Sequence, residues 1–372
     1  MHYIIAAHVL YNDKGQDTFG PAHSIFEFLI KKKKTVSFLK HSLESSYSKI
    51  VINGKEEQEL CKNKPQNVVI RSWNHSKLNF KYTKKIHDKK IYIGVDPVNS
   101  ISGVLLKSFG LISKNIYFTA DYTEDRFNNP LLNSIYHFVD KICLKMADEA
   151  WCVSSRIVSK RLSQGVDKKK VVFMPNSPDL RTIKPKKYDG NKNLIIVSNL
   201  TKSLNLKPIL EVVKKVLLID KKITLTIVGS GTEEKAFKKM VKKEGLEKQV
   251  VFTGQKNHDE VLDLLANSFL GFALYTRENN WNNYGDSMKA REYVALGLPV
   301  IINDIPATAD DIKKYDCGLV IKEINIKEIS NFIRKTIEDK SYYLKLRNNA
   351  MKLGQDFDKE KLLNNHLIGN KS

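Results

Sequence analysis

The stretch that decides the fold is YGDSMKAREYVALGLPVIIN, residues 284–303. It predicts a polar loop, a short helix over residues 288–296, a glycine stop and a buried strand. Asp286 or Ser287 supplies the N-cap, because short polar side chains accept hydrogen bonds from the first N–H groups of a helix. Gly297 stands where the chain must turn left-handed after the helix. A helix that leads directly into a buried strand is typical of an α/β fold.

The start of this helix also has the chemistry of a nucleotide site. A helix N-terminus offers unpaired N–H groups and a positive dipole end, and Lys289 in the first turn adds a full positive charge. Glu292 follows three residues later and shares the face of Lys289. A cation for phosphate and a carboxylate one turn deeper suit a diphosphate and its ribose hydroxyls. The alternative is a surface ion pair that contributes a few tenths of a kcal/mol; the surrounding loop–helix–strand pattern favours the nucleotide.

SMKAREYVALGLPVI, residues 287–301, resembles the donor-binding helix of retaining GT-B glycosyltransferases of family 4, also called glycosyl transferases group 1. That family commonly carries two glutamates eight positions apart. Glu292 matches the second, while Tyr284 stands at the first; Ser287 and Lys289 fit a Ser-x-Lys variant. LTIVGSGTEEKAF and VVFTG precede this segment in the family's order. The resemblance implies two Rossmann-like, doubly wound parallel-sheet domains that face a central cleft.

The chain of 372 residues is long enough for two domains, and 42% hydrophobic with 28% charged residues is typical of a globular protein. We expect an N-terminal, acceptor-side Rossmann-like domain at residues 1–183 and a polar linker at 184–193. A nucleotide-sugar-binding Rossmann-like domain follows at 194–354. The resemblance implies that residues 355–372 form a helix that crosses back to the first domain.

Alternating strand and helix patterns support this organisation. Strands are predicted at residues 2–9, 35–39, 67–71, 90–95, 115–119, 150–153, 171–174, 194–198, 224–228, 250–252, 269–274 and 300–302. Helices are predicted at residues 21–32, 100–109, 131–147, 207–218, 233–244, 288–296, 326–338 and 340–354. A further helix up to Ala266 opens with Asn257-His-Asp-Glu260, which resembles a capping box.

The sequence has no run near the roughly 18 apolar residues that a membrane span needs. Its start, MHYIIAAHVLYND, lacks a basic n-region and is better interpreted as a first strand than as a signal peptide. The cysteines have no metal-ligand spacing, and reduced thiols are expected; they are Cys61, Cys143, Cys152 and Cys317. We therefore expect a cytoplasmic protein, either cytosolic or peripheral on the inner face of the membrane.

Positive charge is concentrated in the first half of the chain. Of a net charge of +21, residues 1–190 contribute 32 Lys and Arg against 18 Asp and Glu. Such an excess suits an anionic membrane surface or a phosphorylated acceptor. The alternative is a lysine-rich chain whose runs, such as residues 31–34, are solvated helix ends. Nothing resembles a nucleic-acid-binding motif, so nucleic acid is not an expected partner.

The resemblance points to further donor contacts, with one departure. The family often places an arginine and a lysine at the first strand–helix junction of the second domain, where this chain has Asn199 and Leu204. Lys202 from the same loop or Arg277 from the opposite side is the expected replacement, and either is also plausible as a solvent-facing charge. The remaining donor contacts are expected in glycine-containing loops, at Gly15, Gly20 and Gly229.

A carboxylate of the first domain completes the predicted site. NIYFTADYTEDRF, residues 115–127, ends a predicted strand with Asp121, near the point where many relatives carry a histidine or aspartate facing the sugar. Asp121 is therefore expected to orient a sugar hydroxyl or to stabilise positive charge on the sugar. The alternative for this loop is a structural role, in which Asp125 and Arg126 form an ion pair.

The resemblance implies retaining transfer of a sugar from a nucleotide-diphosphate sugar to a glycan or lipid-linked acceptor in envelope polysaccharide or glycolipid synthesis. Ser287 and Lys289 would bind phosphate, Glu292 would bind ribose, and the catalytic residues would be Asp121, Lys289 and Glu292. No cofactor and no obligatory metal are implied. Two alternatives stay open: a nucleotide-sugar epimerase or phosphorylase of the same fold, and a catalytically silent binding or assembly subunit.

Overall fold

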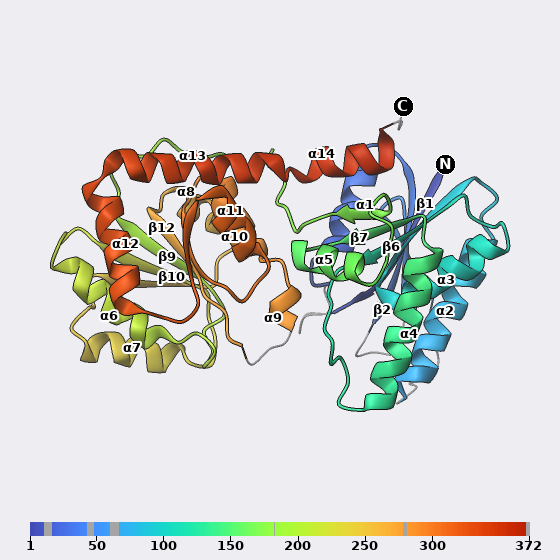
Figure 1. Ribbon diagram of the computed structural model, residues 1–372, viewed down its shortest axis with the longest axis horizontal. Helices are drawn as coiled ribbons and strands as arrows, with labels where there is room; N and C mark the ends of the chain where they lie inside the picture. Colours follow the sequence, from blue (N-terminus) through green and yellow to red (C-terminus); the bar gives the residue numbers. More distant parts are fainter. Residues whose placement is uncertain (11–16, 43–47, 60–66, 182, 278–280, 370–372) are drawn as a thin grey trace. The chain divides into compact units, whose positions relative to one another are not determined.

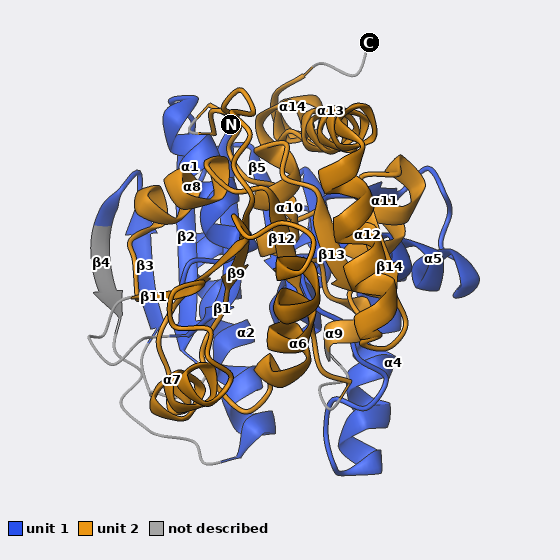
Figure 2. Cartoon of the chain, turned by 90° about the vertical axis from the view of Figure 1, so that its left-hand side faces the viewer, with its two compact units in different colours: residues 1–174 blue, residues 175–372 orange. Residues whose placement is uncertain are grey.

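The computed structural model divides the chain into two compact units, residues 1–174 and 175–372 (Figure 2). The described residues are 1–10, 17–42, 48–59, 67–181, 183–277 and 281–369. Gly15, a predicted donor contact, lies outside them. Each unit is built on its own sheet.

The first unit contains an eight-stranded sheet in the order β4-β3-β2-β1-β5-β6-β7-β8. Its strands are β1 (His2–Val9), β2 (Thr35–Ser42), β3 (Ser48–Ile52), β4 (Lys55–Glu59), β5 (Lys90–Val95), β6 (Lys114–Thr119), β7 (Glu149–Cys152) and β8 (Val171–Phe173). All neighbours pair in parallel except at the β2–β3–β4 edge, which is antiparallel. The predicted parallel sheet is thus extended by a hairpin.

Helices cover both faces of this sheet. They are α1 (Pro21–Lys31), α2 (Val68–Lys84), α3 (Asp96–Ser108), α4 (Pro130–Met146) and α5 (Ser155–Ser163). Helix α3 packs on β1, β5 and β6, and α2 and α4 flank it on the same face, whereas α1 and α5 lie on the other face (Figure 1). The central strands are consequently buried on both faces, as expected for parallel strands.

The second unit contains a six-stranded, wholly parallel sheet in the order β11-β10-β9-β12-β13-β14. Its strands are β9 (Asn193–Val197), β10 (Thr224–Val228), β11 (Val250–Gly254), β12 (Leu270–Ala273), β13 (Val300–Asn303) and β14 (Gly318–Ile321). Its helical segments are α6 (Leu206–Leu217), α7 (Glu234–Lys243), α8 (His258–Ala266), α9 (Trp281–Tyr284), α10 (Met288–Ala295), α11 (Thr308–Tyr315), α12 (Ile326–Glu338), α13 (Lys340–Asp356), α14 (Lys359–Leu363) and the π-helical turn η1 (Asn364–Ile368).

The core of the second unit has two halves, one on each face of the sheet. Successive strand residues point to opposite faces, and β9 shows this directly: Leu194 and Ile196 join the cluster under α6, α7 and α12, while Ile195 joins the cluster under α8, α10 and α11. These two apolar layers hold the carboxyl ends of β9 and β12 in place.

Both sheets have a topological switch point, where the strand order reverses. In the first unit the chain moves outward from β1 and then returns to place β5 on the other side of β1; in the second unit β9 and β12 have the same relation. Ligands of open α/β sheets bind beyond the carboxyl ends of the strands at such points. The β1/β5 and β9/β12 switch points are therefore the two places in the fold where ligands are expected.

The main error of the sequence-based assignment concerns residues 67–71, predicted as a strand. They begin α2, because the Asn67 side chain accepts a hydrogen bond from the N–H of Val69 at 2.8 Å and caps a 17-residue helix. The β3–β4 hairpin, α5, α11 and β14 were not predicted. Residues 175–181 and Ile183, assigned to the first domain, belong to the second unit, where Ile183 joins the core. No helix of the described residues is long and apolar enough to span a bilayer.

Candidate functional site

A hollow of about 390 Å³ lies at the β9/β12 switch point of the second unit. Its lining comes from the end of β9 and the loop after it, from β12 and the loop after it, and from Asn282 and Lys289. Neutral polar and apolar side chains share the wall, and among the described residues that line it Lys289 is the charged one. Its wall thus combines apolar side chains with many hydroxyl and amide groups, which suits a ligand that forms several hydrogen bonds.

Ser287 shapes the mouth of this hollow by starting helix α10. Its hydroxyl accepts a hydrogen bond from the N–H of Ala290 at 3.1 Å and contacts the Tyr275 hydroxyl at 2.5 Å. Ser287 is thus the N-cap, one of the two residues predicted for that role. Because its hydroxyl already has these partners, its first task is to orient the helix, and phosphate binding by Ser287 stays a prediction.

A buried ion-pair group fixes the loop beneath the helix. The guanidinium of Arg291 donates to Asp286 at 2.8 Å and to Asp311 at 2.6 Å. The carboxylate of Asp286 also accepts from the Thr308 hydroxyl at 2.7 Å and from the N–H of Asn176 at 2.8 Å. Removing one member of a buried ion pair leaves an uncompensated charge, which typically costs about 3–5 kcal/mol. This group therefore holds the start of α10 rigidly against the sheet.

Tyr293 ties the same helix to both strands of the switch point. Its hydroxyl accepts a hydrogen bond from the N–H of Val197 at 3.1 Å. Its ring packs on Gly271 of β12, where an added Cβ would stand 2.4 Å from the ring. A glycine at 271 is therefore needed for α10 to approach the sheet. Gly297, with φ of +71°, ends the helix in the left-handed conformation that its position predicted.

Lys289 and Glu292 lie on one side of α10 and influence each other's charge. Burial raises the pKa of Glu292 to about 7, an effect that the positive charge of Lys289 partly offsets. Burial likewise lowers the pKa of Lys289, against the opposing effect of Glu292. Only 12% of the Glu292 side chain is exposed. Strongly perturbed groups next to a hollow are typical of functional sites, so the predicted pair is brought together as a candidate site.

His258 is a member of this site that the sequence did not single out. Its Nε2 lies 3.7 Å from Oε1 of Glu292. The predicted capping box at Asn257 and Glu260 is confirmed, and it places His258 in the first turn of α8. The contact joins residues far apart in the sequence, and the one available signal was the position of the histidine at a helix start after a strand.

Lys202 and Arg277 are the two candidates to replace the arginine and lysine that the family often places at the donor diphosphate, here called the diphosphate clamp. The two residues differ in their surroundings. Lys202 is exposed in the loop after β9, beside the hollow's lining residues Thr201 and Ser203. Arg277 pairs with Asp304 at 2.7 Å and is 59% exposed. Arg277 likewise follows a lining residue, Thr276, so the two differ in that Arg277 has a structural partner in Asp304. A phosphate contact by either residue stays a prediction, and the departure at Asn199 and Leu204 remains, since both line the hollow.

The predicted glycines have local structural reasons. Gly229 has φ of +129°, and an added Cβ would stand 1.9 Å from the carbonyl oxygen of Ser198, so this turn packs tightly against the loop after β9. Gly20 precedes α1 with an ordinary extended conformation, and its N–H donates to Nδ1 of His23 at 3.2 Å. Donor contacts by these two residues stay predictions.

Asp121 belongs to the first unit, in the loop after β6. It pairs with Arg126 at 2.9 Å and is 48% exposed. The expected Asp125–Arg126 pair is replaced by this Asp121–Arg126 pair, while Asp125 accepts a long hydrogen bond from Asn133 at 3.4 Å. Asp121 is thus oriented by an arginine at the carboxyl edge of its sheet.

Comparison with family models finds a match within the second unit. Residues 180–353 match the family model described as glycosyl transferases group 1. No curated protein sequence matches the chain.

Solved structures resemble the chain over nearly its whole length. HepE from Anabaena in complex with UDP is 15% identical with a TM-score of 0.70, covering 99% of this chain and 98% of HepE. WaaB, a lipopolysaccharide outer core galactosyltransferase, is 15% identical with a TM-score of 0.66, covering 98% of each chain. TarM from S. aureus is 17% identical with a TM-score of 0.55; the match covers 96% of this chain and 65% of TarM, so the chain spans less than two thirds of TarM.

At these identities the similarity shows the fold. The predicted α/β architecture with two Rossmann-like domains is confirmed. The chain therefore has the GT-B fold, and its residues 180–353 match the glycosyl transferases group 1 family.

Proposed function

We propose that this protein transfers a sugar from a nucleotide-diphosphate sugar to a glycan or glycolipid acceptor, with retention of anomeric configuration, as a family 4 enzyme. The observation that carries the proposal is the α10 segment. Within the residues that match the family model, it presents Lys289 to a hollow at the β9/β12 switch point, with Glu292 one turn deeper. A cation at a helix start suits a diphosphate, and a buried carboxylate suits ribose hydroxyls.

The neighbours support this choice of donor. HepE has been solved with UDP and with UDP-glucose, which makes uridine nucleotides the first donors to test. WaaB is described as acting on the lipopolysaccharide outer core. An envelope polysaccharide or glycolipid is accordingly the proposed setting for this chain.

In the proposed reaction the bond between C1 of the sugar and the diphosphate oxygen breaks, and its electron pair leaves on the diphosphate. The acceptor oxygen bonds to C1 on the same face, and its proton passes to the leaving phosphate oxygen. Lys289 and the N-terminus of α10 stabilise the negative charge that develops on the diphosphate. With this charge stabilised by the protein, the proposed reaction has no obligatory metal.

The experiment is a panel of nucleotide sugars with the intact chain, read by thermal shift and by slow hydrolysis of the donor. At least one donor should stabilise the protein and be hydrolysed, and Lys289→Ala should weaken the stabilisation and lower kcat/KM for hydrolysis about a hundredfold. Lys248→Ala is the matched control, because Lys248 is exposed in the loop before β11 at the opposite edge of the sheet. Binding without nucleotide release would support a silent subunit, and an isomerised sugar nucleotide would support an epimerase.

We further propose that the first unit binds an anionic membrane surface, through α2 and α4. Both helices expose large apolar side chains, more than half exposed in most cases: Val69, Ile70 and Trp73 on α2, and Leu131, Ile135 and Phe138 on α4. Helix α2 also carries four basic residues and no acidic one. Exposed apolar and aromatic side chains among basic ones are typical of interfacial helices.

A further inference from the structure

Helix α2 of the first unit turns polar residues inward and apolar residues outward. Its buried residues are all polar and lie four positions apart on one face of the helix: His75, Asn79 and Thr83. Three apolar residues of its N-terminal half are each more than half exposed: Val69, Ile70 and Trp73. A surface helix usually has the reverse arrangement, with its apolar side chains toward the core. Polar contacts therefore carry much of the attachment of this half of α2.

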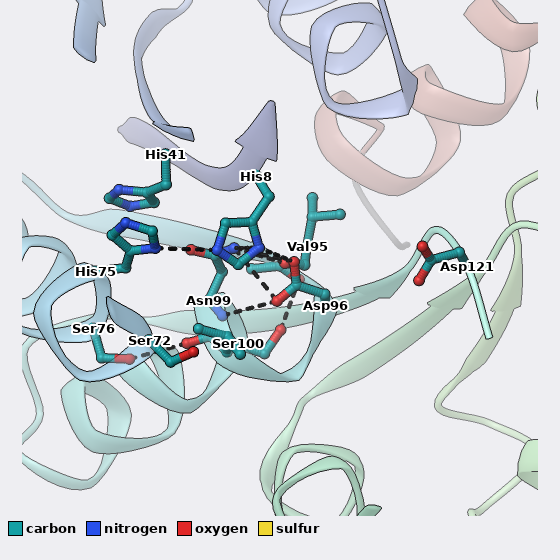
Figure 3. A network of polar contacts seen from close by, with 12 residues as sticks. His8, His41, Ser72, His75, Ser76, Val95, Asp96, Asn99, Ser100 and Asp121 are labelled. Atoms are coloured by element: carbon teal, nitrogen blue, oxygen red, sulfur yellow. Dashed lines mark hydrogen bonds and ion pairs between the residues drawn. The ribbon is translucent and has the colours of Figure 1, made fainter. Parts of the chain in front are cut away.

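Two histidines form the centre of this attachment (Figure 3). The ring of His75 stacks on the ring of His41 from β2, with centroids 4.4 Å apart and planes 18° from parallel. Nε2 of His41 donates to Oδ1 of Asn79 at 2.8 Å, and its Nδ1 lies 2.8 Å from the Ser48 hydroxyl. His41 is 1% exposed and His75 is 5% exposed. A strand residue and a helix residue thus meet ring to ring inside the unit.

The hydrogen bonds that join this half of α2 to α3 are between neutral groups as well. The Ser76 hydroxyl donates to the carbonyl oxygen of Val98 at 3.1 Å, and the Ser102 hydroxyl donates to the carbonyl oxygen of Ser76 at 3.3 Å. The side-chain amide of Asn79 donates to Oδ1 of Asn99 at 3.2 Å. A neutral hydrogen bond contributes little net free energy, because water offers similar bonds to the separated groups. These bonds therefore align α2 without adding a charged anchor.

Charged groups act on the stacked rings from three elements. Arg71 belongs to α2 itself, His8 lies near the end of β1, and Asp96 begins α3. Nδ1 of His8 donates to Oδ2 of Asp96 at 2.8 Å, and Nε2 of His8 lies 3.1 Å from Nδ1 of His75. Figure 3 shows Asp96 on the far side of His8 from the stacked rings. Among the described residues, a proton on the stack would therefore meet cationic or neutral groups first, and this carboxylate only across His8.

Burial keeps both stacked rings neutral. It lowers the pKa of His75 to about 2, and the positive charges near that ring act in the same direction. It lowers the pKa of His41 to about 4, although the hydrogen bond to Asn79 opposes this shift. An exposed histidine has a pKa of about 6.5, so a released helix binds protons that the attached helix excludes. The attachment is therefore strongest above about pH 6.5 and weakens as the pH falls.

We infer that α2 is a pH-sensitive hinged helix, whose N-terminal half, residues 68–79, leaves the unit when the stacked pair of His41 and His75 takes up a proton. A proton on either ring places a charge in a buried site, and a second proton places two like charges in stacked rings. Leaving costs this half little apolar burial, because its three outward apolar residues are already exposed. The C-terminal half stays attached, because Phe80 and Tyr82 pack against the apolar core.

A pair of satisfied core histidines is the simpler account of the stack. It explains the hydrogen bonds of His41 to Asn79 and Ser48, but it does not explain why the same helix is polar inside and apolar outside. The two accounts differ in what acid does. Core histidines loosen the whole unit at once, whereas a hinged helix opens while the rest of the unit stays folded.

Release of α2 also has a consequence for the membrane surface proposed above. An anionic leaflet attracts cations, protons included, so the N-terminal half of α2 is loosened where it meets such a surface. This consequence rests on the proposed membrane binding. The release itself is measured without lipid, so either proposal can fail while the other stands.

The test is amide hydrogen exchange of the intact chain between pH 7.5 and pH 5, resolved by mass spectrometry and expressed as protection relative to the intrinsic rate at each pH. Protection of residues 68–79 should fall about thirtyfold for each of the two histidines, because the released form binds their protons with a pKa of about 6.5. At pH 5 these residues should be less protected than α4 of the same unit. Protection that does not change with pH, or that equals the protection of α4 at every pH, would overturn the inference.

Two variants separate proton uptake by the stack from its packing. His75→Phe keeps an aromatic ring in the stack but cannot bind a proton, so it should make the fall in protection about thirtyfold smaller. His87→Phe is the matched control, because His87 is exposed in the loop after α2, and it should leave the fall unchanged. An unchanged fall in His75→Phe would refute the role of the stack. If His75→Phe does not fold, the comparison of α2 with α4 in the wild type still decides.

Discussion

The two switch points of this molecule have the same topology and opposite contents. At the β9/β12 switch point, the wall combines apolar side chains with neutral polar ones, and Lys289 is the charged residue among the described lining residues. At the β1/β5 switch point, two carboxylates, Asp96 and Asp121, meet one histidine and one arginine. The first arrangement attracts an anion, and the second attracts hydrogen-bond donors and repels an anion.

This difference indicates how one architecture, used twice in the chain, can present two chemically different edges. The fold supplies a ligand-binding edge in each unit, and a few side chains at the strand ends decide which ligand binds there. Burial acts on each site in its own way: it raises the pKa of Glu292, whereas at Asp96 the charges of His8 and Arg126 outweigh it. The comparison therefore predicts distinct responses to mutation in the two units.

The largest effect is expected for the buried arginine beneath α10. Arg291→Met should destabilise the second unit by about 3–5 kcal/mol, because Asp286 and Asp311 would be left as buried carboxylates without their cation. Amide hydrogen exchange resolved by mass spectrometry should show faster exchange in residues 286–316. Two units need not unfold together, so a local measurement is required.

The first unit offers a matched variant for this prediction. Arg161 is buried against Asp140, also with Tyr117 and Thr119 as partners. Arg161→Met should speed exchange in the first unit and leave residues 286–316 unchanged. Faster exchange of both units in either variant would contradict the independence of the two frameworks.

Removal of the Lys289 cation at the proposed donor site should have the next largest effect. Lys289→Ala should lower kcat/KM for the donor about a hundredfold, since removing a transition-state charge contact costs on the order of 3 kcal/mol. Lys202→Ala should also lower kcat/KM, but by less, because Lys202 is exposed on a loop whereas Lys289 is fixed by its helix. Steady-state hydrolysis of the best donor gives both values.

Arg277→Ala decides between the two candidates for the clamp. Normal kinetics for Lys202→Ala with a strong loss for Arg277→Ala would assign the clamp to Arg277. Normal activity in all three variants would remove the phosphate site from this face of α10.

The pH dependence of stability tests the environment of Glu292. With a folded-state pKa of about 7 against an ordinary value of 4.5, Glu292 binds its proton more tightly in the folded protein. Its contribution to stability is therefore present below about pH 4.5 and is lost as the pH rises through 7. Relative to Glu292→Gln, the wild type should lose up to about 3 kcal/mol between pH 5 and pH 8.

Urea unfolding across this pH range measures the effect. Glu323→Gln serves as the control, because Glu323 is exposed after β14. A constant difference between wild type and Glu292→Gln at all pH values would show that Glu292 is not shifted by burial.

The donor kinetics of Glu292→Gln are expected to change by a smaller factor than those of Lys289→Ala. If Glu292 holds the ribose hydroxyls, Glu292→Gln should raise the donor KM or lower turnover by about tenfold, as expected for loss of a hydrogen bond to a charged group. Unchanged donor kinetics in the folded variant would remove Glu292 from the site and leave Lys289 without its proposed partner.

The sequence predicted what depends on neighbouring residues. The cap at Ser287, the glycine stop at Gly297 and the capping box at Asn257 are local signals, and the structure has all three. Residues 67–71 were wrongly predicted as a strand, because Val-Val-Ile is typical of strands. In the structure the side chain of Asn67 caps a helix that begins at Val68.

Contacts between distant residues could not be predicted. His258 meets Glu292, and His8 meets His75 and Asp96, only because the sheets bring strand ends together. The order of strands at a switch point follows from packing of the whole unit. The spacing of histidines along the sequence therefore did not indicate that they would lie at the same edge of a sheet.

The remaining predictions concern the membrane, where the two units should again differ. Each basic residue near an anionic surface contributes about 1 kcal/mol, so Lys77→Ala with Lys84→Ala on α2 should weaken binding to anionic vesicles by roughly thirtyfold at low salt. The same double substitution to alanine at Lys239 and Lys243, on the exposed face of α7 in the second unit, should change binding less than about threefold.

Binding of the wild type to anionic vesicles should itself fall steeply toward physiological salt, because screening shortens the reach of each charge. Sedimentation with neutral and anionic vesicles measures all of these values. Equal binding to both vesicle types would refute an electrostatic surface, and equal losses from the two double variants would show that net charge, rather than α2 of the first unit, directs the protein to the lipid.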